Sequence, residues 1–188
     1  MQNAVPSRPT TRGPGVVLVG LPGSGKSTVG RQLARRLNLS FADSDNVIEQ
    51  RLGCSIRDFF EREGEDAFRD VEQSVIHDLT EDLASVLATG GGAVLRPENR
   101  QRLRNAGHVI YLKSLPEEVF RRVRHDSNRP LLQVPDPLGR LRSLYDERDP
   151  LYRETSHFIL ETGRPSVPKL VNMILMQLEL AGVISPRP

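Results

Sequence analysis

Residues 20–27 of this 188-residue chain read Gly-Leu-Pro-Gly-Ser-Gly-Lys-Ser and fit the pattern G-x-x-x-x-G-K-[ST], which is known as the P-loop. The apolar run Val16–Val19 precedes the motif, and residues 27–37, with helical spacing, follow it. In this strand–loop–helix context, the backbone N–H groups of a glycine-rich loop can surround a phosphate at the positive end of the next helix. The motif therefore predicts a phosphate-binding loop rather than a glycine-rich turn without a ligand.

Short apolar runs alternate with longer segments of helical spacing along the rest of the chain. This alternation is typical of a parallel sheet with helices on both faces, in which ligands bind beyond the carboxyl ends of the strands. The strands are expected at residues 16–20, 41–44, 85–89, 109–112 and 158–161.

One domain, residues 16–180, is expected because no internal linker is long enough to separate two. Two regions interrupt the alternation: a helical insertion at 46–80 and a proline-containing segment without helical period at 124–137, which we interpret as a lid. Residues 1–15 are rich in proline and arginine and predict a disordered tail, with a truncated organelle-targeting peptide as the alternative. Residues 181–188 are assigned to a C-terminal tail.

Composition narrows the functional class. The single cysteine, Cys54, excludes a disulfide framework within the chain and favours the cytoplasm. No apolar run approaches the ~20 residues that a membrane span needs. The net charge of +2 does not by itself indicate nucleic-acid binding. We therefore expect a monomer with small-molecule substrates and neither a nucleic-acid nor a membrane partner.

Two carboxylates, Asp43 and Asp45, follow the second expected strand, which places them at the ligand edge beside the P-loop. One could hold a Mg²⁺-bound water or take a proton from the acceptor, and the other could bind substrate hydroxyl groups. The alternative is that both acids cap the next helix. The third strand ends without an aspartate, so Asp43 is our candidate for the carboxylate that many P-loop ATPases carry there.

Glycines and arginines supply further candidates. Gly90–Gly91–Gly92 follow the third strand and suit a substrate packed against bare backbone, although a tight turn would also explain them. Spacing alone favours a surface pair between Arg69 and Glu72 over a role in the cleft. Arg148 precedes Asp149-Pro150, which is expected to end its helix.

These motifs together resemble shikimate kinase from about residue 16 to residue 180. The P-loop is shared by many ATPases, whereas the combination of the other motifs is specific. The resemblance rests on Gly20-Leu-Pro-Gly-Ser-Gly-Lys-Ser-Thr28, Asp43-Ser-Asp45, Gly64-Glu-Asp-Ala-Phe-Arg69, Thr89-Gly-Gly-Gly-Ala93, Arg129-Pro-Leu-Leu132 and Arg148-Asp-Pro-Leu-Tyr152.

The resemblance implies a three-layer α/β/α fold of the nucleoside-monophosphate-kinase-like P-loop class, with a five-stranded parallel sheet, a helical substrate-binding insertion and a lid loop. It implies transfer of the ATP γ-phosphoryl group to the 3-hydroxyl of shikimate, with Mg²⁺, on the route to chorismate and aromatic amino acids.

The resemblance also implies site residues. Lys26, Asp43 and Arg129 are the implied catalytic residues, and Ser27 and Asp43 the metal ligands. The implied ATP-binding residues are Gly23, Ser24, Gly25, Lys26, Ser27, Thr28, Arg129 and Arg164. The implied shikimate-binding residues are Asp45, Arg69, Gly90, Gly91, Gly92 and Arg148.

Two other functions stay open at this point. The resemblance implies that Arg69 and Arg148 clamp the shikimate carboxylate, and a gluconate-kinase-like enzyme should lack this two-arginine clamp. A regulatory homologue that binds nucleotide without turnover should have lost some of the catalytic residues.

Overall fold

Five parallel strands form the centre of the fold in a computed structural model that describes residues 15–126 and 133–185. The strands are β1 (Val16–Val19), β2 (Ser40–Asp43), β3 (Ser85–Ala88), β4 (His108–Lys113) and β5 (Phe158–Glu161). Their order is β2-β3-β1-β4-β5, and every neighbouring pair is parallel. The expected five-stranded parallel sheet is therefore confirmed. β1 lies between β3 and β4, so the loop after β1 opens at the position where the strand order reverses and ligands bind in such sheets.

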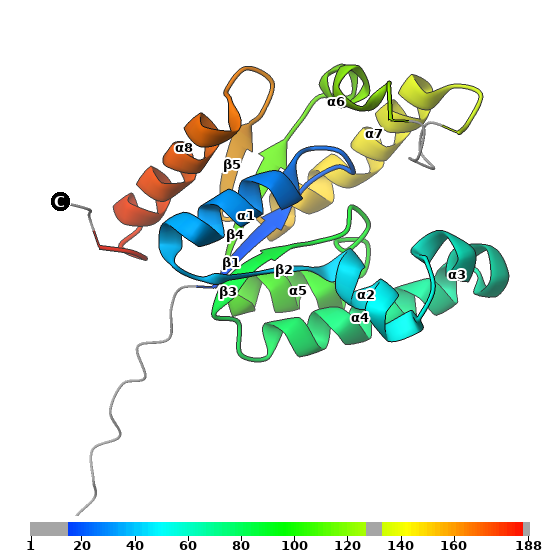
Figure 1. The fold of residues 1–188 in the computed structure, drawn as a ribbon, viewed down its shortest axis with the longest axis horizontal. Coiled ribbons are helices and arrows are strands. Elements are labelled where there is room, and N and C mark those ends of the chain that lie inside the picture. The colour runs from blue at the N-terminus through cyan, green and yellow to red at the C-terminus, as the bar shows by residue number, and fades with distance from the viewer. Residues whose placement is uncertain (1–14, 127–132, 186–188) are drawn as a thin grey trace, which may run out of the picture.

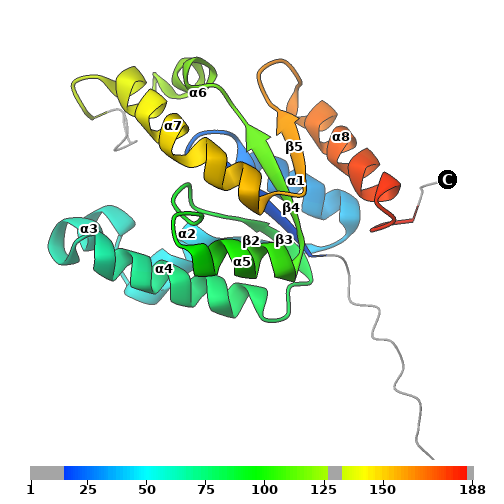
Figure 2. The same cartoon turned by 180° about the vertical axis from the view of Figure 1, so that it is seen from behind.

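Helices cover both faces of this sheet, as the alternation predicted (Figure 1). One core cluster joins β1, β3 and β4 to α1 and α8, and a second joins the opposite sheet face to α4, α5, α6 and α7 (Figure 2). Among the described residues, no helix is both long and apolar enough to span a bilayer. The helices are α1 (Lys26–Leu37), α2 (Ser44–Leu52), α3 (Ile56–Glu63), α4 (Glu65–Thr80), α5 (Pro97–Ala106), α6 (Pro116–Val123), α7 (Pro137–Thr155) and α8 (Val167–Leu180).

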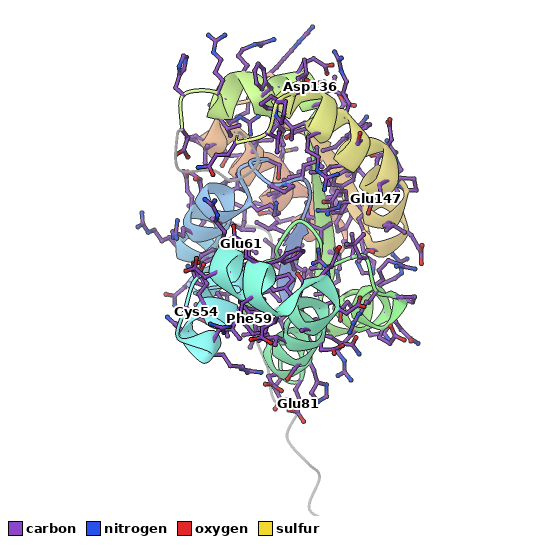
Figure 3. All side chains as sticks on the ribbon, turned by 90° about the vertical axis from the view of Figure 1, so that its right-hand side faces the viewer. Cys54, Phe59, Glu61, Glu81, Asp136 and Glu147 are labelled. Carbon is purple, nitrogen blue, oxygen red and sulfur yellow. The ribbon has the colours of Figure 1, made fainter. Side chains whose placement is uncertain are left out.

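The expected insertion consists of α2, α3 and α4. It has a small core of its own, in which Ile48, Phe68 and Val75 are buried. The insertion begins two residues earlier than expected because Asp43 accepts a hydrogen bond from Asp45 N and so starts α2 at Ser44. Figure 3 looks onto α3, with Cys54 and Phe59 on the insertion; farther up, Asp136 lies directly before α7 and Glu147 lies on it.

The folded unit is longer than the expected domain at both ends. The Gly15 carbonyl accepts a hydrogen bond from His108 N at 2.8 Å, although Gly15 was assigned to the N-terminal tail. Val183 and Ile184, assigned to the C-terminal tail, pack against the core cluster that contains α1 and α8. Residues 1–14 and 186–188, the rest of the two expected tails, lie outside the described residues.

The expectation that Asp149-Pro150 ends its helix is wrong. α7 continues through Pro150 to Thr155. The continuation buries Tyr152 against the Tyr111 ring, with centroids 5.0 Å apart, and Asp149 accepts a hydrogen bond from the Tyr111 hydroxyl. We infer that these tertiary contacts outweigh the hydrogen bond that proline removes from a helix.

Arg104 of α5 closes the C-terminal end of α7. Its guanidinium donates to the carbonyls of Glu154, Thr155 and Ser156 at 3.3, 3.4 and 2.9 Å. A cation at a helix C-terminus also interacts favourably with the helix dipole.

We expect Arg104→Ala to lower the free energy of unfolding by about 1 kcal/mol, because partly exposed carbonyls lose one charged donor. Urea titration measures this change. Arg102→Ala, on the exposed side of the same helix, is the matched control and should stay within about 0.5 kcal/mol of the parent. Equal losses in the two variants would show that Arg104 does not support α7.

Candidate active site

The P-loop connects β1 to α1 and presents its backbone at the carboxyl edge of the sheet. Gly23 and Gly25 have φ values of 81° and 92°, in the left-handed region where glycine avoids the strain of a side chain. Lys26 is buried, and its Nζ donates to the carbonyls of Gly20 and Leu21 at 2.8 and 2.7 Å. The loop therefore holds an ammonium group and the N-terminus of α1 together, as phosphate binding requires.

Asp43 joins the P-loop to the insertion. Its Oδ2 accepts a hydrogen bond from the Ser27 hydroxyl at 2.6 Å, and its Oδ1 caps α2 through Asp45 N at 3.0 Å. The capping alternative is thus correct for Asp43, but the same carboxylate also reaches the first turn of α1. The Asp43 side chain therefore both caps α2 and lies at the phosphate-binding loop.

Two adjoining pockets meet at Asp45. The first, of about 280 Å³, lies between the P-loop, Asp43 and Gly91, and the second, of about 740 Å³, is lined by residues of α2 and α3 together with Gln133. Asp45 lines both, so it stands where a phosphate donor and an acceptor would meet. A groove of about 760 Å³ between α4 and α5 contains none of the expected site residues.

The glycine triplet after β3 forms a wall of this site. A Cβ on Gly91 would lie 2.6 Å from the Pro22 side chain of the P-loop. A Cβ on Gly90 would lie 2.4 Å from Asp45 Oδ1, and one on Gly92 would lie 2.4 Å from Arg69 Nη1. The triplet also forms a turn, in which Ala93 N and Leu95 N donate to the Gly90 and Gly92 carbonyls. Bare backbone at Gly91 is what lets this turn lie against the Pro22 ring.

Arg69 and Arg148 come from α4 and α7 and lie at the same site. The expected pair between Arg69 and Glu72 exists, at 2.6 Å, but Glu72 is only 1% exposed, so the pair is not on the surface. Arg148 is 9% exposed. The Nε atoms of both arginines are buried and have no hydrogen-bond partner among the described residues, which is unusual for guanidinium groups at this depth.

The carboxylates at the site carry shifted pKa values. Burial raises the pKa of Asp45 to about 6, and the negative charge of Asp43 adds to the rise while Lys26 opposes it. Burial also raises the pKa of Glu72, against the opposing charges of Arg69 and Arg148. The influence of Arg148 on Glu72 places both arginines around one buried carboxylate.

Known proteins of one family resemble this chain over most of its length. The family model described as shikimate kinase matches residues 22–179. A shikimate kinase of Paracidovorax citrulli is 63% identical over 94% of this chain and 100% of its own length, and one of Burkholderia lata is 62% identical over 90% and 92%. The chain belongs to the shikimate kinase family. A solved shikimate kinase of Acinetobacter baumannii in complex with shikimate is 46% identical, covers 90% of this chain and 94% of its own, and superimposes with a TM-score of 0.84.

Most residues that the resemblance to shikimate kinase implied are brought together in the structure. The P-loop pocket is lined by Gly23, Gly25, Lys26, Ser27, Thr28, Asp43, Asp45 and Gly91. Arg129 lies outside the described residues. Arg164 is exposed in the turn after β5 and lines a separate pocket of about 630 Å³, apart from the P-loop residues.

The structure places two further residues at the site, Glu72 and Arg122, which no sequence motif indicated as site residues. Glu72 was considered only as a surface partner of Arg69, although Phe68, Val75 and Ile76 of the same helix are buried beside it. Arg122 of α6 donates to the Gly23 carbonyl at 3.2 Å. Nothing in the local sequence distinguishes Arg122 from its neighbours Arg121 and Arg124. Arg122 reaches the P-loop only because α6 packs beside that loop in the folded protein.

Proposed function

We propose that this site transfers the γ-phosphoryl group of ATP to the 3-hydroxyl group of shikimate, giving shikimate 3-phosphate and ADP. Membership of the shikimate kinase family makes the chain an ATP-dependent phosphotransferase of aromatic amino acid biosynthesis. The observation that carries the choice of acceptor is a pair of arginines, Arg69 beside the glycine wall and Arg148 on α7, whose buried Nε atoms have no hydrogen-bond partner among the described residues. Two guanidinium groups and one carboxylate complement the single carboxylate and three hydroxyls of shikimate.

The P-loop holds the nucleotide phosphates in this proposal. Residues 23–28 supply backbone N–H groups, and Lys26 turns its ammonium from the loop carbonyls to the β- and γ-phosphates. Arg122, already hydrogen-bonded to the loop, adds a further positive charge on the same side. Arg129 of the expected lid and Arg164 are the remaining proposed ATP contacts.

Ser27 and Asp43 are suited to holding Mg²⁺. Their hydroxyl and carboxylate oxygens lie 2.6 Å apart at the phosphate loop, and hard oxygen ligands of this kind, together with substrate phosphates, are what Mg²⁺ prefers. When bound, Mg²⁺ neutralises charge on the transferred phosphoryl group. The Ser27–Asp43 hydrogen bond orients both ligands before the substrates arrive.

Asp43 and Asp45 have different roles toward the acceptor in this proposal. Asp45, at the junction of the two pockets, accepts hydrogen bonds from shikimate hydroxyl groups. Asp43 lies at the reacting end, where it either takes the proton of the attacking hydroxyl or orients metal and water around it. Phosphoryl transfer needs little covalent help, so positioning and charge neutralisation account for most of the acceleration.

Shikimate lies against the glycine wall with its carboxylate between the two arginines. Arg69 and Arg148 bind the carboxylate, and Gly90, Gly91 and Gly92 contact the ring through backbone alone. Gluconate also carries a carboxylate, so it is the match to the shikimate kinase family, and not the clamp alone, that favours shikimate over gluconate. Asp43 beside the P-loop favours an enzyme over a regulatory homologue that only binds nucleotide. We place the enzyme in the cytoplasm, as the single cysteine favours, and expect a monomer.

The test is ADP release from Mg²⁺-ATP in a coupled assay, with shikimate, gluconate, AMP or no acceptor in parallel reactions. We expect fast turnover with shikimate and only background with the other three. ATP binding without stimulation by shikimate would instead favour a different acceptor or a regulatory protein.

A further inference from the structure

Tyr152 connects two parts of the acceptor site that come from distant segments. It lies on α7, is 0% exposed, and donates a hydrogen bond from its hydroxyl to the Gly91 carbonyl at 2.6 Å. Gly91 belongs to the glycine wall, 61 residues earlier in the chain. No role in the reaction described above uses this tyrosine.

The hydrogen bond fixes the orientation of a peptide group in the wall. The Gly90 and Gly92 carbonyls accept from Ala93 N and Leu95 N, both at 3.1 Å, within the same turn. The Gly91 carbonyl is held from α7 instead. Because a trans peptide points its C=O and N–H in opposite directions, Tyr152 also sets the direction of the Gly92 N–H. Gly92 is the residue whose Cα faces the Arg69 guanidinium.

Arg148 lies one turn before Tyr152 on the same face of α7, where i and i+4 side chains are neighbours. The charge of Arg148 opposes the rise in the pKa of Tyr152 that burial causes, which agrees with a guanidinium close to the phenol oxygen. The tyrosine hydroxyl is therefore bonded to the glycine wall from the same helix face that carries Arg148.

We propose that Tyr152 is a positioning residue for the acceptor: its hydroxyl fixes the Gly91–Gly92 peptide relative to Arg148, so that the peptide meets the shikimate ring while Arg148 meets the carboxylate. The inference rests on the proposed assignment of these groups to shikimate. Tyr152 acts through its neighbours and takes no part in the transfer itself.

A purely structural role is the competing explanation, because a buried tyrosine hydroxyl usually finds a partner. The chain offers a matched control for it. Tyr111 is also 0% exposed and packs against the Tyr152 ring, but its hydroxyl donates to Asp149 Oδ1 at 2.8 Å and not to the glycine wall. Tyr111→Phe thus removes the same group at the same depth.

The experiment compares Tyr152→Phe with Tyr111→Phe in steady-state kinetics, with shikimate and ATP varied separately and stability measured by urea titration. We expect Tyr152→Phe to raise the KM for shikimate about five- to tenfold, the range for one hydrogen bond that preorganises a site. The KM for ATP should stay within about twofold, and Tyr111→Phe should leave both KM values within about twofold. Reversible partial unfolding would raise the KM for shikimate and the KM for ATP together, because either substrate binds only the folded protein, so a rise confined to shikimate identifies the positioning role.

The proposal is overturned if the KM for shikimate rises no more in Tyr152→Phe than in Tyr111→Phe, or if the KM for ATP rises equally. Either result would assign Tyr152 to stability or to general support of the P-loop. Failure of the proposed function can be told apart from failure of this inference, because in the first case the unmodified protein would not phosphorylate shikimate at all.

Discussion

Asp43→Asn is expected to lower kcat at least ~10²-fold, the loss that follows removal of an acid–base or charge-positioning group. Asn retains an oxygen that can cap α2, so the hydrogen bond from Asp45 N can persist. What disappears is the negative charge next to the Ser27 hydroxyl. Steady-state kinetics at saturating ATP and shikimate measure the effect on turnover.

Asp78→Asn is the control for this substitution. Asp78 is exposed on α4 and pairs with Arg51, so the same loss of charge occurs away from the site. Its kcat should stay near that of the parent protein. A near-parental kcat for Asp43→Asn would remove Asp43 from the mechanism and leave it only the capping role.

The second large effect concerns the clamp. We expect Arg69→Ala or Arg148→Ala to raise the KM for shikimate on the order of 10²-fold, because each removes about two charge-assisted hydrogen bonds of ~1.5–3 kcal/mol apiece, partly replaced by water. ATP binding should change little, since neither arginine lines the P-loop pocket. Shikimate titration at saturating ATP and ATP titration at saturating shikimate separate the two effects.

Two controls isolate the clamp from stability. Arg142→Ala removes an exposed arginine of α7 that pairs with Glu117, and it should leave the KM for shikimate unchanged. Arg69→Ala leaves the buried Glu72 without its ion pair, so Arg69→Ala combined with Glu72→Gln tests binding without an uncompensated buried charge. Unchanged affinity for shikimate in both single arginine variants would disprove the clamp.

The fold could be predicted because the sequence patterns that indicate its strands and its P-loop each lie within a short stretch of the chain. Apolar runs indicate the buried strands, and the P-loop motif occurs between a strand and a helix. The parallel sheet, and the edge of it at which the site lies, could therefore be predicted from the sequence. Asp43 and Asp45 could be selected for the same reason: Asp43 is the last residue of β2, and Asp45 lies two residues beyond it. The bounds of the elements were less certain, as the start of α2 at Ser44 shows.

The errors arose where distant contacts decide the outcome. Pro150 has the local properties of a helix terminator, and only the packing of Tyr152 on Tyr111 explains why α7 continues. Glu72 and Arg69 have the spacing of a surface pair, and their burial depends on how α4 meets the glycine triplet. Arg122 and Tyr152 reach the site from α6 and α7, whose positions no short motif specifies.

The glycine triplet has a consequence for how such an enzyme can diverge. Its backbone separates the P-loop from the acceptor side, with Pro22 against Gly91, and Asp45 and Arg69 against the glycines on either side. A side chain at Gly91 would collide with the rigid Pro22 ring, whereas one at Gly90 or Gly92 would have to displace Asp45 or Arg69, both proposed acceptor contacts. A change of acceptor preference is therefore easier in the helical insertion, where residues of α2 and α3 line the larger pocket.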